Sequence, residues 1–231
     1  MNHNALAPAG DLGLLVLDRD TWGRRWPGAD RFRPILEHGL PAVGADPEVN
    51  RWRRSNLPNL WRGARRVAAA KAFGVPTHYG ALWGRIIRGD GTTVDLGLMS
   101  LRVVTTVGVG YIVDAFQNLV EAENMRFHGF GTGTTAEAVG NTALVTELTT
   151  QYNPDNTRPT GTQTEAAANI YRNVATLSPD SGGTIAVTEH GVFSAATGGV
   201  LLDRSVFSAV NLVAGTDSLQ TTYDLTFTAG G

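Results

Sequence analysis

The chain has 231 residues, no cysteine and a formal net charge of −2. The lack of thiols excludes disulfides, thiolate metal sites and cysteine nucleophiles together. With 42% apolar residues, the composition favours a packed core over disorder throughout. A chain of this length fits one domain with a long extension, or two small domains.

Positive charge and tryptophan gather in the first part of the chain. Residues 1–90 hold 14 Lys or Arg against 8 Asp or Glu, whereas residues 91–231 hold 5 against 13. The stretch from Arg51 to Lys71 carries seven cations and no acid. Because Trp and Arg often anchor interfaces, we predict a docking arm over residues 1–80, joined to a body over residues 81–231. The predicted anchors are Trp22, Trp26, Trp52, Trp61, Trp83, Arg51, Arg53, Arg54, Arg62, Arg65 and Arg66.

The arm is expected to be mostly irregular, extended chain, because prolines recur along it. These prolines are Pro27, Pro34, Pro41 and Pro47. A short helix is predicted after Pro58, with Asn59 as its cap.

Cationic Trp/Arg segments suit three kinds of partner: the phosphates and bases of nucleic acid, a membrane surface, or an acidic protein surface. A fourth reading places the arm on its own acidic body. The breakers Pro58 and Gly63 interrupt the segment, which favours protein docking or self-packing. We therefore expect neither a nucleic-acid nor a membrane partner.

The body is expected to consist mainly of β-strands. A β-hairpin is predicted where Leu82–Arg88 and Thr92–Leu96 flank a glycine-containing turn. Further strands are predicted over Leu101–Val107, Met125–Phe130, Ile170–Leu177, Thr184–Phe193, Val200–Phe207 and Ser218–Thr228. Evenly spaced short strands favour an antiparallel β-sandwich, here expected to be jelly-roll-like.

One amphipathic helix is predicted within this body. From Val109 to Val120 the apolar residues follow i, i+3, i+4, i+7 spacing, so we expect this helix to pack by its apolar stripe. A loop is predicted over Gly131–Asn141, and one or two helical turns over Thr142–Leu148.

Motifs for chemistry are weak. The run Gly129–Thr135 suggests a phosphate cradle but lacks the G-x-G-x-x-G spacing and a following cation, so a turn at a strand end explains it better. Arg88-Gly89-Asp90 matches an adhesion motif, yet a glycine turn between charged residues produces the same letters. The five histidines form no ligand pair in sequence, which leaves open a meeting of two of them in space. We predict no catalytic, cofactor or metal site, and hence no enzyme.

Slightly more than half of the chain resembles a family of tailed-phage virion proteins. The matching segments are V-V-T-T-V-G-V-G-Y-I-V-D-A-F-Q-N (Val103–Asn118), F-H-G-F-G-T-G-T-T-A-E (Phe127–Glu137), T-A-L-V-T-E-L (Thr142–Leu148), A-N-I-Y-R (Ala168–Arg172), T-E-H-G-V-F (Thr188–Phe193), L-L-D-R-S-V-F (Leu201–Phe207) and Y-D-L-T-F (Tyr223–Phe227). Their order is also similar to the β modules of phage tail-collar and fibre proteins.

The resemblance implies a non-enzymatic structural protein of the virion. Our first expectation is a capsid decoration (cement) protein, with the arm on the major capsid protein or another virion protein and the body forming a dimer or trimer. The alternative is a tail fibre or collar component that binds a host receptor. A polysaccharide-active enzyme is the third and least favoured hypothesis.

Overall fold

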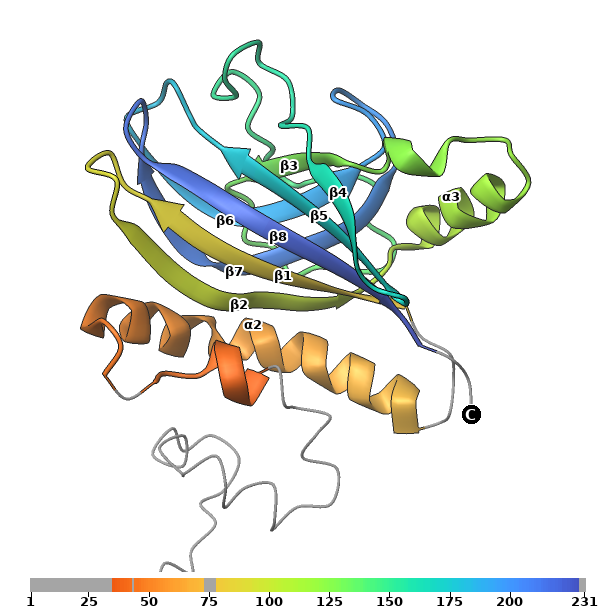
Figure 1. The fold of residues 1–231 in the computed structure, drawn as a ribbon, viewed down its shortest axis with the longest axis horizontal. Coiled ribbons are helices and arrows are strands. Elements are labelled where there is room, and N and C mark those ends of the chain that lie inside the picture. Colours follow the sequence, from red (N-terminus) through yellow and green to blue (C-terminus); the bar gives the residue numbers. More distant parts are fainter. Residues whose placement is uncertain (1–34, 43, 73–77, 229–231) are drawn as a thin grey trace, which may run out of the picture.

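The computed structural model describes residues 35–42, 44–72 and 78–228, and within them two antiparallel sheets form a β-sandwich (Figure 1). The strands are β1 (His78–Ile87), β2 (Thr93–Val103), β3 (Phe127–Gly131), β4 (Thr162–Ala167), β5 (Ile170–Leu177), β6 (Thr184–Phe193), β7 (Leu201–Val213) and β8 (Ser218–Phe227). One sheet has the order β2-β1-β8-β5-β4, and the other has the order β3-β6-β7. The predicted mainly β, antiparallel fold is confirmed.

Most predicted strands are present. β1 and β2 form the expected hairpin, β5 and β6 have the predicted bounds, and β7 runs on to Val213. β8 alternates as expected, with Leu219, Tyr223 and Leu225 buried. β4 was not predicted, because its sequence T-Q-T-E-A-A has no apolar alternation and its side chains are mostly exposed. The helical turns predicted over Thr142–Leu148 are wrong: this segment is an irregular strap whose backbone amides bind a buried carboxylate.

The largest correction concerns helix α2 (Pro47–Ala72), which was expected to be irregular chain with a short helix after Pro58. Asp46 directly precedes the helix and caps it, because its Oδ1 accepts a hydrogen bond from the amide of Glu48 at 2.7 Å. Pro47 occupies the first helical position, where a missing N–H is harmless. Pro58 lies inside the helix with its ring on the exposed side. Burial of the opposite side against the sandwich offsets the hydrogen bond that Pro58 removes.

Two apolar clusters explain why α2 belongs to the body. The first fills the space between the sheets and includes Phe130, Val187 and Leu219. The second joins Leu57 and Leu60 of α2 to strands β1 and β2, and it also takes in Ile35 of the π-helical turn η3 (Ile35–Gly39). The described part of residues 35–80 therefore packs on the sandwich, as the self-packing alternative holds, and is not a separate extended arm.

Helix α3 (Thr106–Phe116) is present where the apolar periodicity predicted a helix, and a short 3-10 turn, η4 (Ala122–Asn124), follows it. Its apolar stripe is covered only in part: Ile112 and Val120 pack against the first cluster, whereas Val109 is 44%, Val113 49% and Phe116 84% accessible. Figure 1 shows the reason, because α3 projects from one end of the sandwich and no other helix or strand of the described residues covers its outer side. Among the described residues, no helix has both the length and the apolar content needed to cross a membrane.

Candidate functional site

Helix α2 lies along the line where edge strand β2 of one sheet meets edge strand β7 of the other, here called the seam (Figure 1). Edge strands leave backbone groups without ladder partners. Asn56, fully buried, supplies both kinds of partner: its Nδ2 donates to the Met99 carbonyl in β2 at 2.8 Å, and its Oδ1 accepts from the Ser208 amide in β7 at 3.0 Å. One amide side chain thus bridges the two sheets.

Two predicted anchors reinforce the seam from the inner side of α2. The indole Nε1 of Trp52 donates to the carbonyls of Ser208 and Ala209 at 3.0 and 3.1 Å. Arg53 donates through Nε to the Leu96 carbonyl at 3.0 Å. Both side chains therefore bind the chain's own strands, and their role as anchors for a partner stays a prediction.

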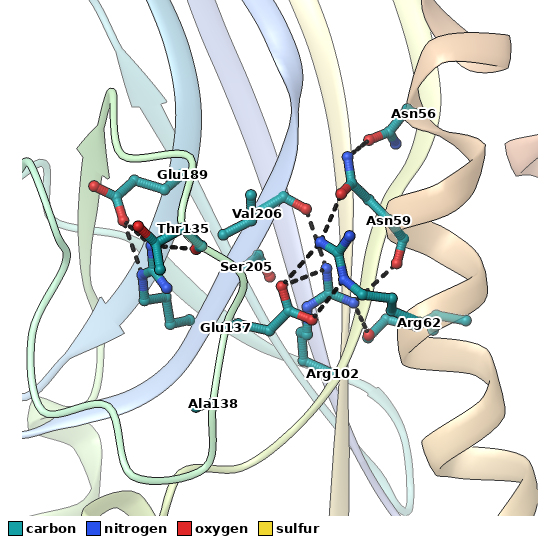
Figure 2. A network of polar contacts seen from close by, with 12 residues as sticks. Asn56, Asn59, Arg62, Arg102, Thr135, Glu137, Ala138, Glu189, Ser205 and Val206 are labelled. Carbon is teal, nitrogen blue, oxygen red and sulfur yellow. Dashed lines mark hydrogen bonds and ion pairs between the residues drawn. The ribbon is translucent and has the colours of Figure 1, made fainter.

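A buried ionic cluster continues the seam toward the loop after β3 (Figure 2). The Arg102 side chain is 2% exposed and lies 3.2 Å from the Glu137 carboxylate, while its Nη2 donates to the Val206 carbonyl at 3.1 Å. Arg62 of α2, another predicted anchor, reaches the same carboxylate at 3.4 Å. Burial lowers the pKa of Arg102 to about 10, so the guanidinium stays charged at neutral pH. Glu137 is thereby clamped between a helix and a strand.

Asp203 lies near Arg102, and its carboxyl group gains or loses its proton near neutral pH. It is buried in β7 and accepts a hydrogen bond of 3.4 Å from the Tyr223 hydroxyl. Burial raises the pKa of Asp203 to about 7, although the Arg102 charge acts in the opposite direction.

The glycine run after β3 does cradle an anion, but the anion is the chain's own Glu189. The amides of Gly133, Val145 and Thr146 donate to this carboxylate at 3.0, 3.1 and 2.7 Å. The Arg204 side chain, which is 1% exposed, completes the site, with its Nη2 2.7 Å from Glu189 Oε2. A Cβ on Gly133 would lie 2.4 Å from Glu189 Oε1, so a glycine is needed at this position. The loop therefore binds a carboxylate of the same chain. This agrees with the prediction that the Gly129–Thr135 run is a turn at a strand end and not a phosphate site.

Two histidines distant in sequence meet in the core. His190 Nε2 lies 2.9 Å from His128 Nδ1, which is also 3.2 Å from the Thr221 hydroxyl. Burial lowers the pKa of His128 to about 4 and that of His190 well below 6.5. Both rings are therefore neutral at physiological pH and lie inside the sandwich. Within the described ranges, no three acidic or histidine side chains gather as a metal site.

The outer side of α2 carries the other predicted arginines. Arg51, Arg54, Arg65 and Arg66 are all exposed. Within residues 35–42, 44–72 and 78–228, no ion pair neutralises any of these four side chains. We call these four arginines the cationic face.

The remaining predicted anchors divide into two groups. Trp61 and Trp83 are half-buried and pack against the second apolar cluster, and the Trp83 ring meets His38 edge-on at 4.8 Å. Trp22 and Trp26 lie outside the described residues. In the Arg88-Gly89-Asp90 turn, Arg88 pairs with Asp217 at 2.8 Å and Asp90 caps the Thr92 amide at 2.9 Å, so both charges of the adhesion motif have intramolecular partners.

Sequence reasoning missed the buried ionic groups. The available signal was a charge inside an otherwise apolar strand, as in L-M-S-L-R102, T-E189-H-G-V-F and L-L-D-R204-S-V-F. Such charges require an internal partner. The identity of that partner is a property of the folded chain, since Arg102 and Glu137 come from a strand and a distant loop. Comparison with protein-family models and with curated protein sequences found no match.

Proposed function

We propose that this chain is a structural protein of a tailed-phage virion, acting as a capsid decoration (cement) protein. In this proposal the cationic face of α2 docks on an acidic surface of the major capsid protein or of another virion protein. The observation that carries the proposal is the contrast between the two sides of α2. One side is fixed to both sheets through Trp52 and Asn56, and the other presents four arginines.

A fixed helix suits docking because little conformational freedom remains to be lost on binding. Guanidinium groups also match carboxylates in a bidentate geometry, which favours an acidic protein surface. Decoration multiplies a modest contact over many copies on one particle, so each interface need not be strong alone. The resemblance over residues 103–231 supports a virion role independently of the charge.

The proposed role is non-enzymatic. Its support is the way the interior charges are used: Arg204 and Arg102 bind carboxylates of the same chain, and Arg158 grips Glu147 through two nitrogens while stacking 3.5 Å from the Phe193 ring centroid. These groups cross-link loops to sheets, as a load-resisting shell component requires.

A tail fibre or collar component remains the alternative. It is favoured by one specific observation, since the two segments most similar to fibre modules, 188–193 and 201–207, are paired in the three-stranded sheet.

The test uses particles that lack this protein and the purified chain added back. The variant Arg54→Glu/Arg65→Glu should weaken binding at least roughly tenfold, and added salt should weaken wild-type binding, because exposed ion pairs are screened. Arg85→Glu is the control, because it reverses an exposed arginine on β1.

Unchanged binding of the double variant, with a normal melting temperature, would refute docking through α2. Particles that keep full head stability without the protein but lose adsorption would favour the fibre alternative. Binding of the purified chain to DNA, with no binding to particles, would move the partner to nucleic acid.

A further inference from the structure

An uncovered apolar surface lies on and beside helix α3. Eight large apolar side chains are exposed within the described residues, and six of them belong to this region. They are Val107, Val109, Val113, Phe116, Leu119 and Val139. Val139 joins the group because its carbonyl accepts the amide of Thr106 at 2.8 Å, which places the loop beside the start of the helix. We call these six residues the α3 patch.

The two glycines of α3 have different explanations. Gly108 is buried, and a Cβ there would lie 2.6 Å from the Leu202 carbonyl oxygen, so close packing on β7 requires it. Gly110 is exposed, and no atom lies within 4 Å of its Cβ position. A helix-interior glycine weakens a helix, and no contact with a described residue offsets that loss at Gly110. A surface from outside the chain that approaches closely would supply the reason.

We propose that the α3 patch is the contact between two copies of this chain, packed about a two-fold axis with their α3 helices antiparallel. In this arrangement Val113 lies near the axis. Phe116 of each copy enters the space beside Gly110, between Val109 and Val113 of the other copy. A two-fold contact uses the same patch twice, so a continuous apolar stripe is complementary to itself.

Charge and area favour a second copy as the occupant. Residues 105–120 contain a single charged side chain, Asp114, which is half-buried and lies to the side of the exposed stripe. A self-pair therefore buries no unpaired charge. The exposed parts of the six side chains amount to roughly 500 Å² per copy, so a pair that covers all of them buries roughly 1,000 Å², the lower bound for a specific interface. The patch is also at the upper end of what a monomer normally exposes.

The inference deepens the proposed function by naming how a virion component would associate with itself, and it rests on that function only for its biological use. The test needs no particle. Sedimentation equilibrium of the purified full chain should give a monomer–dimer equilibrium.

Two substitutions probe opposite sides of the contact. Phe116→Ser should raise the dimer dissociation constant at least roughly tenfold. Gly110→Gln should do the same, yet raise the melting temperature at dilutions where the wild type is monomeric, because the isolated helix gains stability. Val213→Ser is the matched control, since it removes an apolar side chain that is 47% exposed on β7.

A wild type that stays monomeric at its highest soluble concentration would overturn the proposal. So would a trimer, or a dimer that tolerates both α3 substitutions. Failure here would leave docking through the cationic face untouched, because that experiment depends on α2 alone.

Discussion

Arg204→Met tests whether the interior ion pairs hold the fold together. The Arg204 and Glu189 side chains are 1% and 0% exposed and lie 2.7 Å apart. Methionine keeps the length of the side chain but leaves Glu189 as a buried carboxylate with three amide donors and no counter-charge. Removing one partner of a buried pair costs about 3–5 kcal/mol. For a chain of this size that corresponds to a fall in melting temperature of roughly 10 °C.

The measurement is equilibrium unfolding in urea, followed by tryptophan fluorescence. Arg172→Met is the matched control, because Arg172 binds Asp224 with two bonds of 2.7 Å but is 41% exposed. Exposed pairs contribute about 0–1 kcal/mol, so this control should lose less than about 1 kcal/mol.

A second variant separates the charge effect from the loss of packing. Arg204→Met/Glu189→Gln removes the stranded charge and keeps an acceptor for the amides, so it should be more stable than Arg204→Met alone. The reasoning fails if Arg204→Met costs no more than Arg172→Met, or if the double variant is the less stable of the two.

Three further predictions follow from the seam and the glycine cradle. Asn56→Ala should lower the free energy of unfolding by about 2–4 kcal/mol because it strands the Met99 carbonyl and the Ser208 amide, whereas Ser55→Ala on the exposed side should change it by less than about 0.5 kcal/mol. Gly133→Ala should cost about 1–3 kcal/mol through its clash with Glu189, while Gly140→Ala, with open space around it, should be nearly neutral; equal unfolding midpoints would contradict the cradle. Asp203 has a folded pKa of about 7, above its value of 3.8 in an unfolded chain, so its contribution to stability is fully present below pH 3.8 and is lost as the pH rises through 7. The stability of Asp203→Asn relative to wild type should therefore increase by about 3 kcal/mol between pH 5 and pH 8, and a flat difference would show that this carboxyl does not titrate there.

The strands were predictable because their signal is local. In β8, alternate positions of one short segment share the buried face, and no distant residue is needed to see it. The sequence does not predict the full length of helix α2, because a proline such as Pro58 usually breaks a helix. Its effect depends on which side of the helix it occupies, and that is set by packing on β2 and β7. Periodicity did locate α3, but an apolar stripe shows only that a face avoids water and does not say what covers it.

The candidate site was less predictable than the fold. The cation-rich stretch coincides with helix α2, yet the sequence did not separate inward Arg53 and Arg62 from outward Arg54 and Arg65. That division depends on where Leu96 and Glu137 lie in space. The glycine run had the composition of an anion cradle, and only the fold shows that its anion is Glu189.

The seam also sets an order of events in biosynthesis. Helix α2 is translated before every strand it joins, and the Ser208 backbone groups bound by Trp52 and Asn56 follow about 150 residues later. Likewise β1 pairs with both β2 and β8, the last strand among the described residues. The inner side of α2 therefore lacks its partners until these later strands have formed, and pairing over such sequence distances slows folding. During that interval the inner side of α2 is free to enter the seam of a neighbouring nascent chain, so crowded synthesis on one messenger should favour exchange of this helix between copies.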